Sequence, residues 1–481
     1  NITENQMKLN LFGHIFSIKC KKIDIYETGE LFNKIEFDIE NIVSYYLDCM
    51  TSILMIVVNL GISVYFILNI SKSLAGITFI TIPMLYFINF IFQKKVYMMN
   101  QKIRIFTDKY YSFLNESLSE VIQIKAFGLE NIVSQRYKEY LKERLRILLK
   151  KEVLLQKIGF IRGGSGNIIN VIILFIAGMS IVAGNMTIGM LVSFCSYMEK
   201  FFEALSKIME LNLNKQEVVV SYERMNEILN SEKEENNGII LKEPIQKIQF
   251  RQVIFGYKDN LVLKKIDLSI ENPGLYSLVG SNGCGKSTIF KLLERFYECK
   301  VGKIEINQVP INKYSASDLR NNIVYMPKKP FFLQGTIMDN LKLGQNEISD
   351  LEVIEVCKKV GIHSDIQKLE KGYYELIESG GENFSSGQKQ KLGFVRVLLK
   401  KADIVLLDEV TSDLDGEAER QICNQIEEIA KKAIVLNIAH KPESIRRSKK
   451  VFFIQGGKIV AEGTHKALMK NCVDYKKIFA N

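Results

Sequence analysis

The stretch LYSLVGSNGCGKST, residues 275–288, decides the fold of the second half of this 481-residue chain. It begins as a short apolar strand and continues with the spacing GxxxxGKS/T, which forms a loop around phosphate groups. Glycines allow backbone N–H groups to approach the phosphates, and the following helix adds its positive N-terminal end. The sequence therefore predicts a nucleotide-binding loop. Its residues are Gly280, Ser281, Asn282, Gly283, Cys284, Gly285, Lys286, Ser287 and Thr288.

Three residues of this loop have distinct expected roles. Lys286 should reach the β- and γ-phosphates and take part in catalysis, and the hydroxyl of Ser287 should bind Mg²⁺. Cys284 lies at a helix N-terminus, a position that lowers the pKa of a thiol and makes it reactive. The alternative interpretation of Cys284 is a small residue that simply fits the loop.

Two further apolar strands are expected to end beside this loop. They are ADIVLLDE, 402–409, and AIVLNIAH, 433–440, and such continuous apolar runs are typical of buried parallel strands. The carboxyl ends of these strands form the ligand-binding edge of an open α/β sheet. We therefore predict that Asp408 binds Mg²⁺ directly or through water, and that Glu409 is the general base for the attacking water. His440 is predicted to contact the γ-phosphate and help to orient that water.

Four apolar runs in the first half predict membrane-spanning helices. The first two runs are residues 51–70 and 73–93. The block 163–198 is uncharged for 36 residues and is interrupted near 183–189, so we divide it into a third and a fourth run. About 20 apolar residues match the thickness of a hydrocarbon core. Four such runs in tandem are not typical of a soluble protein, so we interpret them as spans. Residues 9–18 are too short to span and are interpreted as the tail of another helix.

The distribution of charge predicts the orientation of these spans. Fourteen Lys and Arg lie between Lys94 and Lys157, whereas the short turns at 69–72 and 183–189 contain only Lys72. Since basic loops stay on the cytoplasmic side, we expect 94–157 and the nucleotide-binding half in the cytoplasm. A composition rich in Lys, Ile and Asn and without Trp indicates a bacterial source. The expected location is thus a bacterial cytoplasmic membrane.

Composition excludes several other classes of protein. The formal net charge is +10, but the basic residues lie beside the apolar runs, so nucleic acid is not an expected partner. Eight dispersed cysteines without a CxxC pair argue against a disulfide framework or a zinc site. The segment 231–244 is charged and aperiodic and is predicted to be a linker. It separates a membrane domain, 1–230, from a nucleotide-binding domain, 245–481.

The order of the motifs resembles that of the ATP-binding cassette of ABC transporters. After the phosphate loop come ENFSSGQKQ (382–390), LLDE, SDLD (412–415) and IAH. Apolar spans fused to such a cassette resemble the exporter half-transporters, in which two chains pair. The resemblance implies ATP as the ligand, an all-α transmembrane domain of the type IV exporter kind, and an α/β P-loop NTPase cassette. Such exporters have six spans per chain, so the resemblance also implies that about one and a half N-terminal spans are absent from this sequence.

The resemblance assigns further roles that the residues alone do not. Tyr257 matches the aromatic residue that stacks on adenine, and Ser412 and Asp415 match the D-loop. The segments 27–42 and 115–131 resemble the two cytoplasmic coupling segments. The signature, which is implied to contact the ATP held by the partner chain, consists of Ser385, Ser386, Gly387 and Gln388.

Three positions depart from the family pattern, and the first, Phe384 in place of a leucine, is a mild change of size in an apolar slot. Ser386 replaces a glycine, which costs about 1 kcal/mol if the position needs a positive φ and little if it lies in the first turn of a helix. Lys328 stands where the family has a glutamine that contacts Mg²⁺ and water. An ammonium group has no lone pair for a metal, so Lys328 is expected to pair with a phosphate or a carboxylate, or to point away.

The sequence predicts an ATPase that drives export, with several choices left open. A homodimer and a heterodimer with one weak ATP site both fit the motifs. The nearly uncharged spans favour a peptide, a drug or a lipid-like substrate over a highly charged one. The alternative function is a membrane ATPase that acts as a regulator or channel and transports nothing.

Overall fold

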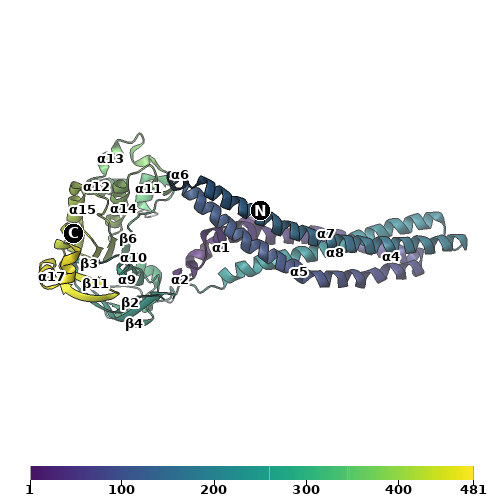
Figure 1. Ribbon diagram of the computed structural model, residues 1–481, viewed down its shortest axis with the longest axis horizontal. Coiled ribbons are helices and arrows are strands. Elements are labelled where there is room, and N and C mark those ends of the chain that lie inside the picture. Colours follow the sequence, from purple (N-terminus) through teal and green to yellow (C-terminus); the bar gives the residue numbers. More distant parts are fainter. Residues whose placement is uncertain (1, 259, 344, 346, 480–481) are drawn as a thin grey trace. The chain divides into compact units, whose positions relative to one another are not determined.

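The computed structural model describes residues 2–258, 260–343, 345 and 347–479, and the chain divides into two units (Figure 1). Residues up to Ile18 and Lys22–Lys233 form a first unit that is helical. Lys19–Lys21 and the chain from Glu234 onward form a second unit that contains all the sheets of the described residues.

Four long helices dominate the first unit, and short elements precede and connect them. Helix α7 has 53 residues, which at 1.5 Å per residue make about 80 Å, far more than the roughly 30 Å of a hydrocarbon core. These helices are therefore long enough to continue well beyond a membrane, as the polar region after residue 93 predicts. The elements are α1 (Ile2–Ser17), α2 (Cys20–Ile23), α3 (Thr28–Asn33), the π-helical η1 (Lys34–Asp38), α4 (Ile39–Ile70), α5 (Lys72–Ser119), α6 (Val121–Ala126), α7 (Glu130–Val182) and α8 (Ile188–Leu229).

The predicted spans fall inside these helices. The first two runs lie in α4 and α5, which meet at Ser71, and the long block divides where α7 ends at Val182 and α8 begins at Ile188. Among the described residues, the stretches Thr28–Ile70 and Glu130–Val182 are long and apolar enough to cross a membrane. Large apolar side chains on them are exposed, for example Leu54 and Phe175, as expected of a surface that faces lipid.

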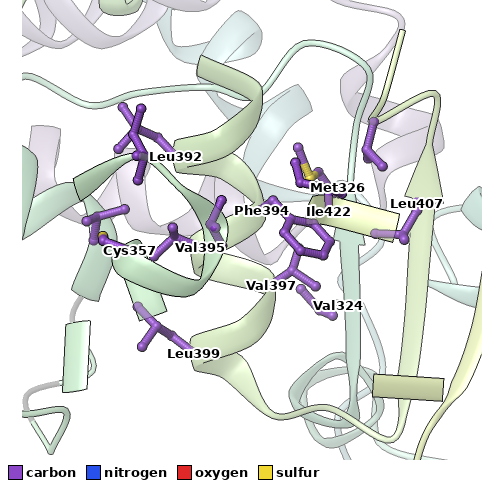
Figure 2. Close-up of a cluster of buried hydrophobic side chains, with 14 of the residues drawn as sticks. Val324, Met326, Cys357, Leu392, Phe394, Val395, Val397, Leu399, Leu407 and Ile422 are labelled. Atoms are coloured by element: carbon purple, nitrogen blue, oxygen red, sulfur yellow. The ribbon is translucent and has the colours of Figure 1, made fainter. Parts of the chain in front are cut away.

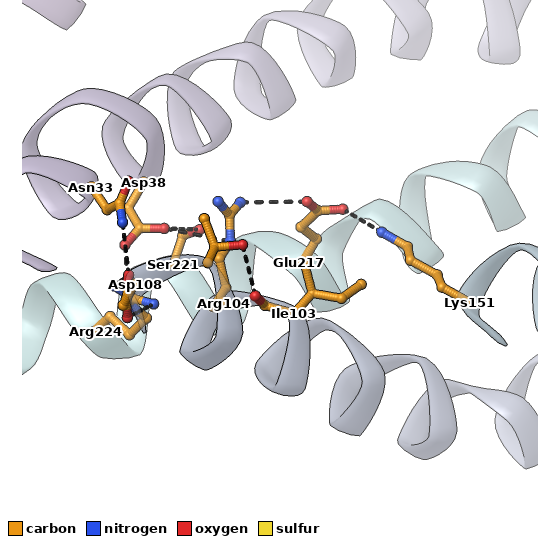
Figure 3. A network of polar contacts seen from close by, with 10 residues as sticks. Asn33, Asp38, Ile103, Arg104, Asp108, Lys151, Glu217, Ser221 and Arg224 are labelled. Atoms are coloured by element: carbon orange, nitrogen blue, oxygen red, sulfur yellow. Dashed lines mark hydrogen bonds and ion pairs between the residues drawn. The ribbon is translucent and has the colours of Figure 1, made fainter. Parts of the chain in front are cut away.

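A charged network crosses the polar part of the first unit (Figure 3). Asp38 of η1 is 1% exposed and lies 3.1 Å from Nε of Arg224 and 3.7 Å from Nε of Arg104. Arg224 also pairs with Asp108 at 2.9 Å, and Arg104 with Glu217 at 3.4 Å. Three elements, η1, α5 and α8, are therefore joined by ions with little access to water.

The described residues of the second unit form three sheets. A four-stranded antiparallel sheet has the order β2-β1-β4-β5, and a six-stranded sheet has the order β12-β11-β3-β10-β9-β6, in which only the β11–β12 pair is antiparallel. Strands β7 and β8 form the third. The strands are β1 (Lys247–Tyr257), β2 (Asn260–Glu271), β3 (Gly274–Gly280), β4 (Val301–Ile306), β5 (Val309–Pro310), β6 (Ile323–Met326), β7 (Gly335–Thr336), β8 (Leu376–Ile377), β9 (Ile404–Asp408), β10 (Ile434–Ile438), β11 (Lys450–Gln455) and β12 (Lys458–Gly463).

Helices cover the six-stranded sheet because its central strands are mostly apolar. Every residue of β9 and β10 is buried, so both faces of these strands need cover. On one side α14 directs Phe394 and Val397 toward β6 and β9, whereas Leu392 lies on the other side of the helix, in the same buried cluster as Cys357 (Figure 2). The helices are α9 (Lys286–Leu293), α10 (Ala316–Asn322), α11 (Ile337–Lys342), α12 (Asp350–Val360), α13 (His363–Gln367), α14 (Ser386–Lys400), α15 (Gly416–Ala430), α16 (Pro442–Arg446), α17 (His465–Asn471) and α18 (Val473–Ile478), with 3-10 turns at Ile311–Lys313, Gly372–Tyr374 and Ser379–Gly381.

Candidate nucleotide site

Four neighbouring parallel strands place most of the predicted site residues at one edge. Strands β3, β10, β9 and β6 are adjacent in that order. The phosphate loop follows β3, His440 follows β10, Glu409 follows β9 and Lys328 follows β6. The register aligns Ile438 with both Leu278 and Asp408, so these carboxyl ends lie side by side. Segments far apart in the sequence thus meet at the edge where open α/β sheets bind ligands.

The phosphate loop leaves no space for side chains at two of its glycines. Gly285 has φ 103°, a left-handed conformation, and a Cβ there would lie 2.4 Å from Cδ2 of Leu263. A Cβ at Gly280 would lie 2.2 Å from the carbonyl oxygen of Ile454. Lys286 is buried, and its ammonium group donates to the carbonyls of Gly280 at 2.7 Å and Ser281 at 3.0 Å. The lysine is thus held within the turn that the glycines make possible.

The remaining loop residues differ in exposure. Ser281, Asn282 and Gly283 are exposed, Ser287 is half-buried and Thr288 is buried. Cys284 is buried, and this burial raises the pKa of its thiol in spite of the nearby Lys286. The hypothesis of a reactive thiol with a lowered pKa is therefore wrong, because loss of hydration outweighs the positive helix end. The structure agrees with the alternative, a small residue that fits the loop.

Asp408 and Glu409 have different surroundings although they are neighbours. Asp408 is buried at the end of β9 and accepts a hydrogen bond of 3.3 Å from the phenol of Tyr325. Burial and the adjacent Asp408 raise the pKa of Tyr325, so its hydroxyl stays a donor. Glu409 has φ 55°, and its backbone N–H donates to the carbonyl of Ile438 at 3.0 Å.

Both carboxylate oxygens of Glu409 are in contact with a basic side chain. Nζ of Lys328 lies 2.5 Å from Oε2, and Nε2 of His440 lies 3.0 Å from Oε1. Burial raises the pKa of Glu409, but the hydrogen bond and charge of Lys328, together with His440, outweigh it and hold the pKa below its usual range. Glu409 is therefore ionised at neutral pH, the form that can accept a proton. Lys328 was expected to pair with a phosphate or a carboxylate, or to point away, and in the structure it pairs with the carboxylate of Glu409.

The signature begins helix α14 and has no described contact with the phosphate loop of the same chain. Ser385 is the N-cap, and its Oγ accepts the N–H of Gln388 at 3.2 Å. Oε1 of Gln388 accepts the N–H of Ser385 at 3.0 Å, which completes a capping box. Ser386 is the first residue of the helix and Gly387 the second. Ser386 thus occupies the first turn, where a serine in place of glycine costs little.

The D-loop residues have structural contacts that the sequence did not indicate. Asp415 is the N-cap of α15 and accepts the N–H of Ala418 at 2.9 Å. Ser412 accepts a hydrogen bond of 3.2 Å from the buried amide of Gln390, which lies on α14. Gln390 therefore ties the signature helix to the D-loop, and our sequence interpretation missed it. The only signal was its position on the buried face, one turn after Gly387.

Tyr257 lies at the end of β1 and is half-buried. Its ring makes edge contacts with Phe255 and Tyr297, with centroids 5.0 and 5.2 Å apart, and Nζ of Lys291 lies 5.5 Å from its centroid. One part of the ring therefore belongs to the core, and the remainder is accessible to a ligand.

Two family models match this chain. A model of the ABC transporter transmembrane region matches residues 2–205, and a model of the ABC transporter cassette matches residues 263–412. The chain belongs to the ABC transporters. It is an exporter-type half-transporter in which the membrane region precedes an ATP-binding cassette, and as such it is an ATPase.

Relatives of the whole ABC transporter chain come from several bacteria. A putative export ATP-binding/permease protein of Rickettsia bellii is 29% identical, over 99% of this chain and 83% of the relative. An uncharacterised ABC transporter ATP-binding protein of Bacillus subtilis, YknV, is 28% identical, over 96% and 77%. An ATP-dependent lipid A-core flippase of Syntrophus aciditrophicus is 27% identical, over 94% and 76%.

A solved structure shares the fold over nearly the full length of this ABC transporter. It is a bacterial Atm1-family ABC exporter with ATP bound, 23% identical, with a TM-score of 0.91 over 99% of this chain and 85% of that chain. The predicted fold class, a helical transmembrane domain followed by an ATP-binding cassette, is confirmed.

Proposed function

We propose that two copies of this half-transporter, or this chain and a related half, form an exporter in the bacterial cytoplasmic membrane. In this proposal residues 1–230 form the membrane domain, 231–244 the linker and 245–481 the cytoplasmic cassette. ATP binds between the phosphate loop of one cassette and the signature of the other. Ser385 and the N–H groups at Gly387, at the start of α14, face the γ-phosphate held by the partner.

The observation that carries the proposed chemistry is the position of Glu409. It is an ionised carboxylate in contact with His440. Glu409 follows β9, which lies next to β10, and β10 lies next to β3, the strand that leads into the phosphate loop. In hydrolysis Glu409 accepts a proton from the attacking water while a bond forms between the water oxygen and the γ-phosphorus. The bond from that phosphorus to the β–γ bridging oxygen breaks, and Lys286 neutralises charge on the phosphates. His440 orients Glu409 and the γ-phosphate.

Magnesium fits the residues proposed for it. Asp408 and the hydroxyl of Ser287 are hard oxygen donors, the kind that Mg²⁺ prefers, and Mg²⁺ takes few protein ligands beside water and phosphate. The described residues contain no cluster of three His, Cys, Asp or Glu that could hold a metal by themselves, which agrees with a site completed by ATP. Bound Mg²⁺ would neutralise charge that develops on the β- and γ-phosphates.

The proposed cargo is apolar or amphipathic: a peptide, a drug or a lipid-like molecule. The apolar runs in α4 and α7 carry few charges, which disfavours a strongly charged cargo. One relative is named a lipid A-core flippase, and this supports a lipid-like molecule as the first to test.

The test uses the full chain in proteoliposomes. Glu409→Gln is expected to lower ATP turnover by about 100-fold or more while ATP still binds, because the amide cannot accept the proton. Glu417→Gln makes the same change at an exposed position of α15 and is the control. Wild-type turnover in Glu409→Gln would remove the assignment of the base. ATP hydrolysis without ATP-dependent movement of labelled lipid or peptide would instead favour the regulator or channel.

A further inference from the structure

Lys328 and Glu409 meet because their strands are neighbours. Strands β6 and β9 are parallel, and Met326 is aligned with Leu407. Lys328 and Glu409 are each two residues beyond these partners, and the ammonium group of Lys328 lies 2.5 Å from Oε2 of Glu409. The contact joins residues 81 positions apart. It therefore results from the order of strands in the sheet and not from local sequence.

In this ion pair, Lys328 contacts the Glu409 carboxylate that the proposed hydrolysis requires. An ammonium group only donates hydrogen bonds, so it cannot bind a cation or accept a proton from the attacking water. It holds Oε2, while His440 holds Oε1. Water must come within about 2.6–3.2 Å of a carboxylate oxygen to be activated, and a cationic donor on that oxygen weakens it as a proton acceptor.

We propose that Lys328 is a positioning residue that restrains Glu409, and that the ion pair opens in each cycle of ATP hydrolysis. This inference rests on the proposed role of Glu409 as the base. Lys328 therefore acts as a brake on turnover by the site built on the phosphate loop of its own chain.

The lysine is the partner that moves. The Lys328 side chain is 57% exposed, whereas that of Glu409 is 17% exposed. The backbone of Glu409 is held by its hydrogen bond to Ile438. Exposed ion pairs are weak and are screened by salt, so the brake slows turnover without stopping it.

Charge-changing variants of the full chain test the brake. Lys328→Gln is expected to raise kcat about two- to fivefold, the size of effect that exposed ion pairs have, with the KM for ATP unchanged. Lys328→Arg retains the charge and is expected to keep the low kcat. Lys329→Gln removes a charge from the adjacent exposed residue and is the matched control. An unchanged or lower kcat in Lys328→Gln would overturn the proposal, and so would an equal rise in Lys328→Arg or Lys329→Gln.

Two further measurements separate the brake from the assignment of the base. Raising the salt concentration from 0.05 to 0.5 M is expected to narrow the gap in kcat between wild type and Lys328→Gln, and a constant gap would contradict the ion pair. Reductive methylation of Lys328, followed by peptide mass spectrometry, is expected to be faster in Glu409→Gln than in wild type; equal rates would also contradict it. If Glu409→Gln keeps full turnover, the proposed base is wrong. If it is inactive but Lys328→Gln matches wild type, the brake alone is wrong.

Discussion

Removal of the Asp38 carboxylate is expected to destabilise the first unit. In Asp38→Ala, the guanidinium groups of Arg224 and Arg104 lose the buried carboxylate between them, and Ser221 loses the acceptor of its 2.8 Å hydrogen bond. Breaking a buried ion pair from one side costs roughly 3–5 kcal/mol. Each arginine keeps a second carboxylate, Asp108 or Glu217, so we expect a loss of about 2–3 kcal/mol.

Thermal unfolding of the purified chain in detergent measures this loss. For a unit of 150–250 residues, 1 kcal/mol shifts Tm by about 2–4 °C, so Asp38→Ala should lower Tm by about 4–12 °C. Lys207→Ala removes one partner of the exposed pair with Glu210 and is expected to shift Tm by less than about 3 °C. A shift in Asp38→Ala no larger than in Lys207→Ala would refute the view that the network stabilises the unit.

The other predictions concern the cassette. Burial raises the pKa of Glu294 from its usual 4.5 to about 7, although the charges of Lys400 and Arg320 act to lower it. Folding therefore favours the protonated carboxyl group. The contribution of Glu294 to the free energy of unfolding is fully present below about pH 4.5 and is lost as the pH rises through 7. Glu294→Gln should therefore raise Tm at pH 8 and leave it unchanged at pH 4; an equal rise at both would contradict the shift. Ser385→Ala removes an N-cap and should cost about 1 kcal/mol, or 2–4 °C in Tm. Ser386→Gly should cost about half as much, and a rise in Tm there would contradict the position of Ser386 in the first turn of α14.

The elements that the sequence predicted are those with a strong local pattern. The phosphate loop, the buried strands before Glu409 and His440, and the division of the apolar block near 183–189 each depend on neighbouring residues only. Such patterns specify helix, strand or turn directly, because spacing determines which side chains share a face. The capping box of Ser385 and Gln388 is also local, and the spacing Ser-x-x-Gln was a signal for it.

Contacts between distant segments were not predictable from spacing. The Lys328–Glu409 pair depends on β6 lying next to β9, and the hydrogen bond from Gln390 to Ser412 depends on how α14 packs. The network around Asp38 likewise requires the relative rotation of η1, α5 and α8. Of the two interpretations of Cys284, the one with a lowered pKa was wrong because burial of the thiol, a tertiary property, raises its pKa.

The left-handed backbone conformation of Glu409 lowers the stability of the cassette at the residue that the proposed activity requires. A side chain other than glycine at φ 55° costs about 1 kcal/mol. Glycine at this position would relieve that cost and make the cassette more stable, but it would also remove the carboxylate that Lys328 and His440 contact. Selection for stability alone would therefore remove the proposed base, so engineering that raises the stability of this transporter must leave position 409 unchanged.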